Sequence, residues 1–523
     1  MSAQRGELLL AVDCGTQSVR ALLVALDGTI LAKCQSPLTG YVCAQPGWME
    51  HDAEAFWRAA AQVCRGLWQD HAGLRARVKG IVVTTQRGTL VPLDAAGQPL
   101  RPFIVWLDQR RASRARRVHP LWQVAFRAAG VSRTIAEFTR AAELNWIAEH
   151  EPALLERTHK VLLLSGWLNY RLTGHLADSV GSQVGYLPLD FKRQRWAADW
   201  DWKWQALPLR REQLPELVPV GSVMGGLTRQ AALATGLPEG LPVIAGAADK
   251  ACEIAGAGAI EPDVGALSYA TAATIAITTP HYLEATPFVP AYPALLPGQY
   301  NTEVQVFRGY WMVSWFKEQF GQPECAAAAD AGLPAEALLD RLLAGVPPGS
   351  DGLVLQPYWS PGIRHPGPDA RGAIVGFTDV HTRAHLYRAM LEGLAYALRE
   401  GKELIQQRSG VAITRLHVSG GGSQSDAAMQ LTADAFDLPA VRPHTSETSG
   451  LGAAIAGAVG LGLHRDFPTA VAAMTRPGRR FEPDPAHAAN YEALYRQVYR
   501  RLYRRLEPLY AAMHKLAAAA GQR

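Results

Sequence analysis

A sharp turn between strand-like segments near the start of the chain constrains the fold more than any other feature. Residues 8–33 read LLLAVDCGTQSVRALLVALDGTILAK: an apolar run, a small polar stretch at 13–17, an alternating segment, and an Asp-Gly pair before a third alternating segment. Alternation with a period of two predicts strands, and Asp-Gly between strands predicts a hairpin. We therefore expect a three-stranded antiparallel meander.

The first turn of this meander has the chemistry of a metal-nucleotide site. Gly15, Thr16 and Gln17 offer backbone N–H groups, and Gly15 is free to adopt left-handed backbone angles, so the turn suits a phosphate. Asp13 would repel a bare phosphate, and this conflict disappears if a divalent cation lies between the two. The alternative is an ordinary tight turn in which Asp13 satisfies its own backbone.

The composition of the whole chain predicts two large globular domains in a reducing compartment. The 523 residues are 48% hydrophobic and carry a formal net charge of +5, which is mild for this size. The densest basic run, residues 110–117, lacks interleaved aromatic residues; we interpret it as a solvated helix face and expect no nucleic-acid partner. The six cysteines lack CxxC spacing, and neither a signal-peptide pattern nor a membrane-length apolar stretch is present. We expect a cytoplasmic protein with no membrane partner.

A second turn, much later in the chain, is similar to the first. Residues 265–279 read GALSYATAATIAITT: a strand, a small polar turn at 268–271, and another strand. Two similar hairpins suggest a duplicated fold with one phosphate-holding turn in each domain, facing each other across a cleft. Coincidence among short alanine-rich strands is the alternative.

Glycine-rich stretches mark the candidate domain junction and a candidate ligand loop. In residues 240–260 an apolar strand ends in small residues and Asp249, and we place the junction there. Gly420–Gly422 lie between a strand and a helix, where the backbone can approach a flat or phosphorylated ligand. Near the C-terminus, residues 491–506 carry an apolar stripe opposite arginines, which predicts a docked surface helix.

Taken together, these residues resemble the FGGY carbohydrate kinases, the glycerol, xylulose and gluconate kinase group of the actin-like and hexokinase-like ATPase fold. The resemblance covers nearly the entire chain. The motifs that carry it, in family order, are DCGTQSVRA (13–21), PGWMEHD (46–52), RPFIVWLDQR (101–110), LNYRLTG (168–174), AGAADKACEIAGAG (245–258), RGAIVGFTDVHTRAHLYRAMLEGLAY (371–396) and SGGGSQSDAAMQLTAD (419–434). It implies an α/β fold of two ribonuclease H-like ATPase domains, residues 1–249 and 250–523, flanking a cleft.

The resemblance also implies roles for individual residues. Asp249 matches the catalytic aspartate, the general base that takes the proton from the attacking sugar hydroxyl, and the end of a strand suits such a base. Asp13 matches the acid that engages Mg²⁺ through water. The positions implied to hold ATP are Gly15, Thr16, Gln17 and Thr271 for the phosphates and Gly420, Gly421 and Gly422 for the adenosine.

Four positions depart from the family pattern. Ala270 stands where the second phosphate turn usually has glycine, and Glu143 stands where the first signature expects lysine. Lys250 follows the catalytic aspartate, where glutamine or asparagine is common. Gly88 replaces the glutamate that holds a glycerol hydroxyl in glycerol kinases, which makes glycerol a poorer fit and leaves room for a longer polyol or ketose.

The expected function is that of an ATP- and Mg²⁺-dependent kinase acting on a small-molecule sugar or polyol, most favourably a pentulose such as xylulose. Arg87, Trp106 and Asp108 are the candidate substrate contacts beside Asp249. Glycerol kinase is the alternative within the family, and a non-catalytic sugar-binding or ATPase protein of the same fold is the alternative of another class. A homodimer is the candidate assembly.

Overall fold

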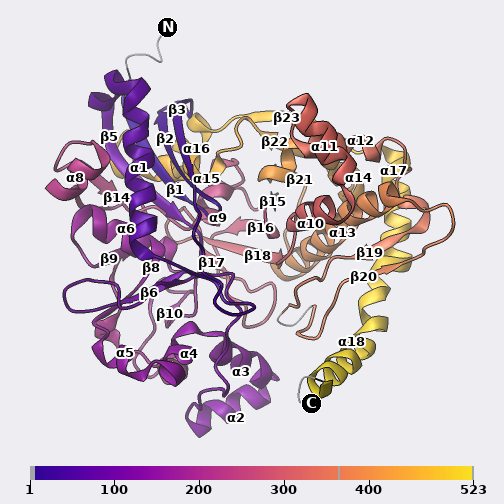
Figure 1. Cartoon of the computed structure of the whole chain (residues 1–523), viewed down its shortest axis with the longest axis horizontal. Coiled ribbons are helices and arrows are strands. Elements are labelled where there is room, and N and C mark those ends of the chain that lie inside the picture. Colours follow the sequence, from indigo (N-terminus) through magenta and orange to yellow (C-terminus); the bar gives the residue numbers. More distant parts are fainter. Residues whose placement is uncertain (1–5, 363–365, 521–523) are drawn as a thin grey trace.

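Two mixed sheets, one from each half of the chain, form the centre of the molecule (Figure 1). The computed structural model describes residues 6–362 and 366–520, without the side chains of 518–520. The first sheet has the order β13-β14-β5-β1-β2-β3. Its strands are β1 (Leu8–Cys14), β2 (Ser18–Ala25), β3 (Ile30–Pro37), β5 (Val78–Thr85), β13 (Val223–Gly226) and β14 (Pro242–Ile244). β1, β2 and β3 pair antiparallel in sequence order, which confirms the predicted meander.

The second sheet repeats the pattern of the first. Its order is β17-β18-β16-β15-β21-β22-β23. In both sheets three antiparallel strands are followed by two parallel neighbours and an antiparallel edge strand, with β17 as an addition in the second. This repetition supports the duplicated fold and argues against coincidence between the two hairpins. The strands are β15 (Val264–Tyr269), β16 (Ala273–Thr279), β17 (Tyr292–Pro293), β18 (Tyr300–Val306), β21 (Arg415–Ser419), β22 (Ala440–Pro443) and β23 (Pro477–Phe481).

Two helices of small residues cross between the sheets. α9 (Asp249–Gly256) and α15 (Thr448–Gly460) approach so closely that a Cβ on Gly256 would lie 2.0 Å from the carbonyl oxygen of Thr448. A Cβ on Gly452 would lie equally close, at 2.0 Å, to the carbonyl oxygen of Cys252. α15 also packs on β1 and β5, so this late segment covers the first sheet. The division of the chain at 249/250 stays a prediction.

The remaining elements cover the outer faces of the two sheets and build a lower lobe. α1 packs on β2 and β3, and α13 packs on β16 and β18. The helices around the first sheet and in the lower lobe are α1 (Ala53–His71), α2 (Pro120–Ala128), α3 (Ser132–Ala141), α4 (Glu143–His150), α5 (Pro152–Arg157), α6 (Leu164–Thr173), α7 (Trp202–Ala206) and α8 (Arg229–Thr235). Those of the second half are α10 (Trp311–Phe320), α11 (Gln322–Ala331), α12 (Ala335–Leu343), α13 (Arg383–Ser409), α14 (Asp426–Phe436), α16 (Phe467–Met474), α17 (Pro485–Leu494) and α18 (Arg500–Ala520).

Short strands complete the architecture. They are β4 (Glu50–His51), β6 (Leu90–Leu93), β7 (Phe103–Ile104), β8 (Lys160–Leu163), β9 (Ala177–Ser179), β10 (Leu189–Asp190), β11 (Arg195–Trp196), β12 (Glu216–Val218), β19 (Val354–Gln356) and β20 (Ala373–Val375). β4, β6, β7 and β8 form a four-stranded sheet of their own, and the others pair in twos.

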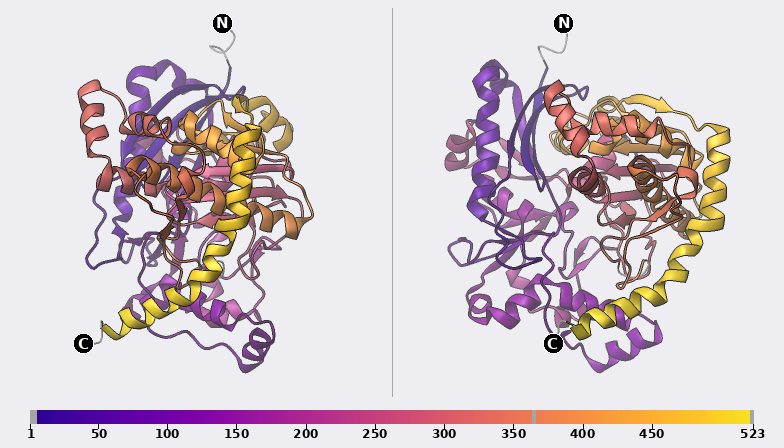
Figure 2. Two further views of the ribbon diagram at one scale, coloured as in Figure 1. Left: turned by 90° about the vertical axis from the view of Figure 1, so that its right-hand side faces the viewer. Right: turned by 45° about the vertical axis from the view of Figure 1, so that its right-hand side comes forward.

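The C-terminal helix docks on the second half, as the sequence predicted. Figure 2 shows α18 running down the outside of this half toward α2 and α3. Leu494, Val498 and Leu502 pack against its core, and Tyr491 is fully buried. A π-helical turn at Tyr495–Tyr499 separates α17 from α18. None of the helices in the described part of the chain has an apolar run long enough to cross a bilayer.

The basic run at residues 110–117 is largely solvated, as predicted, but it is not helical, and its first arginine is buried. Residues 108–119 form an irregular segment. Arg110 is buried: its guanidinium pairs with Asp108 and Glu50, both at 2.7 Å, and lies 4.1 Å from the ring centre of Trp48. These contacts hold Arg110 inside the protein, and a regular amphipathic pattern could not satisfy them.

Candidate active site

The first turn is braced from three sides. The N–H of Gly15 donates to the carbonyl oxygen of Ser18 at 3.1 Å, which closes the turn. The Thr16 hydroxyl donates to Gln86 Oε1 at 2.6 Å and accepts from Trp106 Nε1 at 2.9 Å. Gly15 does not use a left-handed conformation, and a Cβ there would only meet the Ser18 carbonyl at 3.6 Å. The two neighbours therefore fix the Thr16 side chain in place.

Carboxylates crowd the space behind this turn. Arg20 Nη1 lies 3.1 Å from Glu447 Oε2 and 3.5 Å from Asp13 Oδ2, and Lys33 Nζ pairs with Glu447 Oε1 at 2.7 Å. Burial raises the pKa of Asp13 to about 7; Arg20 opposes the rise, whereas Asp249, Glu447 and Glu253 add to it. A bound cation would favour the charged form of Asp13.

The donor set fits Mg²⁺ held largely through water and phosphate. Within the described ranges, no group of three or more His, Cys, Asp or Glu side chains could bind a metal ion by itself. Mg²⁺ commonly keeps several waters and takes only one or two carboxylates from the protein. Asp13 is placed to be such a carboxylate.

Asp249 opens α9. β14 ends at Ile244, so Asp249 lies at the start of a helix and not directly at the end of the strand. Its Oδ1 accepts a 2.7 Å hydrogen bond from the backbone N–H of Lys250. Burial raises the pKa of Asp249, while the charges of Lys250 and Arg87 oppose the rise. A carboxylate that is partly desolvated and keeps one oxygen free of the helix has the properties of a general base.

One turn further along α9, Glu253 connects the helix to the second sheet. Its Oε1 accepts from the hydroxyls of Ser268 and Ser419, both at 2.8 Å, and its Oε2 pairs with Lys250 Nζ at 2.7 Å. Ser268 and Ser419 face each other in register on β15 and β21. Burial would raise the pKa of Glu253, but Lys250 and the two serines outweigh it and hold this pKa below its usual range. A buried, ionised carboxylate thus joins the Asp249 helix to the strands that lead into the second turn and the glycine loop.

The second turn and the glycine loop pack against one tyrosine. The backbone N–H of Tyr310 donates to the Ala270 carbonyl at 3.1 Å, and that of Trp311 donates to the Thr271 carbonyl at 3.3 Å. A Cβ on Gly422 would lie 2.3 Å from the Tyr310 ring, whereas one on Gly421 would meet open space. Gly420 has φ +83° and sits against the backbone of Tyr269. Packing therefore requires Gly420 and Gly422, and Gly421 remains exposed.

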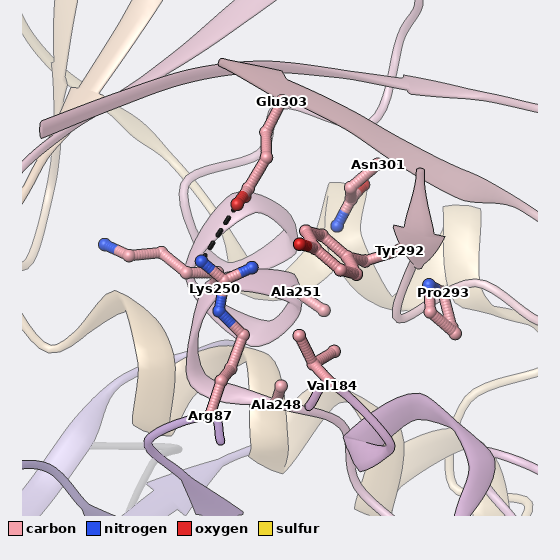
Figure 3. A pocket seen from close by; sticks show the side chains of 9 residues that line it. All are labelled: Arg87, Val184, Ala248, Lys250, Ala251, Tyr292, Pro293, Asn301 and Glu303. Carbon is pink, nitrogen blue, oxygen red and sulfur yellow. Dashed lines mark ion pairs between the residues drawn. The ribbon is translucent and has the colours of Figure 1, made fainter. Parts of the chain in front are cut away.

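A small pocket lies between the two halves beside the start of α9 (Figure 3). Arg87 reaches into it from the end of β5, and its Nη2 pairs with Glu303 Oε1 on β18 at 2.9 Å. The guanidinium also lies 5.1 Å from the ring centre of Tyr292. Lining residues are Arg87, Val184, Ala248, Lys250, Ala251, Tyr292, Pro293, Asn301 and Glu303.

The two other candidate substrate contacts are already engaged. Trp106 holds Thr16, as described above. Asp108 accepts from Arg110 with both oxygens, at 2.8 and 2.7 Å, and from the Met49 N–H at 2.6 Å. Neither residue lines the pocket.

Two positions that depart from the family pattern lie close to these residues. Glu143 begins α4, and its Oε2 is buried with no hydrogen-bond partner in the described part of the chain. Burial raises the pKa of Glu143 to about 8. Gly88 has φ +63°, and its N–H donates to the Val184 carbonyl at 2.8 Å.

Sequence reasoning missed Glu253, Glu303, Glu447 and Tyr310. Glu253 could have been found, because it follows Asp249 by four residues on one helix face. The other three come from segments distant in sequence and carry no motif, so only the tertiary fold places them at the site.

Models of the FGGY family of carbohydrate kinases match the chain twice: the N-terminal domain over residues 8–256 and the C-terminal domain over residues 265–461. A protein named uncharacterized sugar kinase YgcE, from Escherichia coli (strain K12), is 29% identical over 492 residues, covering 93% of this chain and 91% of the relative. A glycerol kinase from Geobacter sp. (strain M21) is 30% identical over 492 residues, covering 91% and 94%.

The solved structures include a xylulose kinase from Rhodospirillum rubrum that superimposes with a TM-score of 0.78. It is 30% identical and covers 97% of this chain and 100% of its own. These matches confirm the expected fold, two actin-like ATPase domains. Both xylulose and glycerol kinases occur among the relatives, so the matches support phosphorylation of a sugar or polyol without selecting the substrate.

Proposed function

Because this chain belongs to the FGGY family of carbohydrate kinases, we propose that it transfers the γ-phosphate of ATP to a hydroxyl of a five-carbon ketose such as xylulose. The kinase reaction and ATP as its phosphate donor follow from the family. The observation that carries the assignment of the site is Asp249, which opens α9 beside a pocket that both halves line. Asp13 and the two candidate phosphate turns complete the parts that phosphoryl transfer needs.

Asp249 acts as the general base in this proposal. Its carboxylate takes the proton as the substrate hydroxyl attacks the γ-phosphorus, and the bond from that phosphorus to the bridging oxygen of ADP breaks. Partial burial makes the carboxylate a better proton acceptor because it raises the pKa of Asp249. Gly15, Thr16 and Gln17 hold phosphate oxygens through their backbone, as does Thr271 in the second turn, and Gly420, Gly421 and Gly422 border the adenosine.

Asp13 holds Mg²⁺ through water in this proposal. When bound, the cation neutralises phosphate charge. Trp106 keeps the Thr16 hydroxyl oriented through the 2.9 Å hydrogen bond. Asp108 fixes Arg110 and the Met49 backbone, so we assign it a positioning role next to the substrate.

Gly88 and the pocket favour a five-carbon ketose over glycerol. A Cβ at position 88 would lie 3.6 Å from Trp106 Cβ and 4.0 Å from the Val184 carbonyl, so space remains where glycerol kinases have a glutamate, and the φ of +63° at this position itself favours glycine. Longer substrates bring additional hydroxyls, each worth about 0.5–1.5 kcal/mol when hydrogen-bonded. Two more hydroxyls would favour the pentulose by roughly ten- to hundred-fold. The glycerol kinases among the relatives make glycerol the second candidate.

The test is a coupled-enzyme assay with glycerol, erythritol, ribulose, xylulose and gluconate. The wild-type protein should show its highest kcat/KM with a five-carbon ketose. Asp249→Asn should lower kcat by about two to four orders of magnitude while ATP binding is retained. Glycerol as the best substrate would contradict the substrate assignment, and half-maximal activity in Asp249→Asn would contradict the base.

A cytoplasmic setting is part of this proposal. All six cysteines are free. Free thiols support a reducing, cytoplasmic location.

The sugar panel also separates the kinase from other proteins of this fold. A constitutive ATPase would hydrolyse ATP at the same rate with every sugar, whereas a protein that only binds sugar would show no turnover with any of them. The homodimer stays a prediction.

A further inference from the structure

The pocket between the two halves contains an acid that no sequence motif indicates. Glu303 lies on β18, and its side chain is only 6% exposed. Its partner Arg87 belongs to the other half, so the 2.9 Å ion pair bridges the two sheets (Figure 3). A buried carboxylate at the wall of a pocket is costly unless it is paired. Arg87 stabilises Glu303 there.

Further polar groups converge on the same small space. Tyr292 directs its hydroxyl end toward the ion pair (Figure 3). Asn301 Oδ1 accepts from the Thr278 hydroxyl at 3.0 Å, and its amide nitrogen points toward Tyr292 with no partner in the described residues. Val184, Ala248 and Ala251 complete the lining with small apolar side chains. The pocket is much smaller than a typical ligand site, so these convergent polar groups on an apolar lining suit only the end of a small substrate.

Gly88 and Glu303 are complementary. Val184 lines the pocket, and its carbonyl oxygen would lie 4.0 Å from a Cβ on Gly88. Position 88 therefore offers no acid beside this pocket, while the second half supplies one inside it at Glu303. Position 88 has no acid, but Glu303, which is distant in sequence, places a carboxylate in the same pocket.

We propose that Glu303 accepts hydrogen bonds from the hydroxyls of the substrate remote from the transferred phosphate, and that the Arg87–Glu303 pair selects neutral polyhydroxyl substrates against sugar acids. This inference rests on the proposed function and specifies its substrate class. A neutral chain of hydroxyls can donate to Glu303 without adding charge. The carboxylate of a sugar acid would meet Glu303 and Asp249 in a desolvated site where Arg87 is already neutralised, and such like-charge contacts are a strong source of discrimination.

The test compares Glu303→Gln with the wild-type enzyme on xylulose and gluconate. The amide keeps the shape of the side chain and removes its charge. A hydrogen bond to a charged acceptor is worth about ten- to hundred-fold in affinity, so the KM for xylulose should rise by that factor. The kcat at saturating xylulose should stay within about threefold, because Asp249 is untouched. The KM for gluconate should fall, because Arg87 becomes free to pair with its carboxylate.

Glu261→Gln is the matched control. It removes the same charge from an exposed position outside the pocket and should leave both KM values unchanged. An unchanged xylulose KM in a folded Glu303→Gln protein would overturn the inference, as would gluconate as the preferred wild-type substrate. If Glu303→Gln does not fold, Glu303→Asp serves as the test variant. Its shorter carboxylate should raise the KM for xylulose and still exclude gluconate. An unchanged KM for xylulose in Glu303→Asp would refute the inference.

Direct binding separates this inference from the proposed reaction. Calorimetric titration of the nucleotide-free protein with xylulose measures the pocket alone. A wild-type protein that binds xylulose through Glu303 but phosphorylates no sugar would refute the kinase assignment and support the pocket. Phosphorylation of xylulose with equal binding by wild type and Glu303→Gln would support the kinase and refute the inference, and absence of xylulose binding to wild type would also refute it.

Discussion

Replacing Glu253 should weaken the fold and the chemistry together. This buried carboxylate pairs with Lys250 and accepts from the hydroxyls of Ser268 and Ser419, all at 2.7–2.8 Å. Removing one partner of a buried, hydrogen-bonded ion pair typically costs about 3–5 kcal/mol. We therefore expect Glu253→Ala to lower the free energy of unfolding by about that amount, measured by urea denaturation followed by circular dichroism.

The effect on turnover follows from the position of Glu253 on α9. Asp249 lies one turn earlier on the same helix, and Glu253 is its link to β15 and β21. A misplacement of about 1 Å at a reacting group can cost about a hundred-fold in rate, so kcat should fall by roughly that factor while sugar KM changes less. Ser419→Ala is the graded control: it removes one of the three hydrogen bonds and should cost about 1 kcal/mol.

The pH dependence of stability gives an independent check. Burial would raise the pKa of Glu253, but Lys250 and the serines hold it below the ordinary value of 4.5. The folded protein therefore binds this proton less readily than the unfolded chain. The stabilisation is complete above about pH 4.5 and disappears as the pH falls through the folded pKa. A Glu253→Ala protein with the wild-type denaturation midpoint and more than half of the wild-type kcat would refute this reasoning.

Two further substitutions probe the nucleotide side of the site. Asp13→Asn should abolish Mg²⁺-dependent turnover. Burial raises the pKa of Asp13 from 3.8 to about 7, so the stability of the wild-type protein falls as the pH rises between these values. The neutral amide avoids this loss, and the variant without ligand should therefore be more stable than wild type at pH 8 by up to about 4 kcal/mol. A lower melting temperature than wild type at pH 8 would contradict this. Gly422→Ala places a Cβ 2.3 Å from the Tyr310 ring and should raise the KM for ATP at least tenfold, whereas Gly421→Ala faces open space and should change it little; equal effects would exclude steric packing as the cause.

Features that depend on neighbouring residues in the sequence were predicted correctly. The meander at residues 8–33 follows from alternation and an Asp-Gly turn, and the repeated sheet was visible in residues 265–279. Composition misjudged Arg110, because a charged side chain was taken as solvated, whereas Glu50, Asp108 and two tryptophans hold it inside. Asp249 and Arg87 could be predicted as site residues because they stand in segments that resemble those of the family.

The rest of the site depends on contacts between segments distant in sequence. Glu447 reaches Arg20 and Lys33 on strands from the first sheet, and Glu303 reaches Arg87 from the second. Neither acid stands in a pattern that period or spacing could reveal, because each is defined by its partner in the other half. The packing of α9 against α15, together with that of α15 on β1 and β5, brings the two halves, and therefore these pairs, together.

The crossing of α9 and α15 also bears on how the two halves can move. At Gly256 and Gly452 the helices meet through their backbones, because a Cβ at either glycine would lie 2.0 Å from a carbonyl oxygen of the other helix. Such a contact leaves no room for the two helices to come closer, so it fixes the distance between them. Groups farther from this crossing also connect the halves, and the Arg87–Glu303 pair is one of them. A substrate that contacts both Arg87 and Glu303 would therefore connect the two halves at a second point, away from the helix crossing.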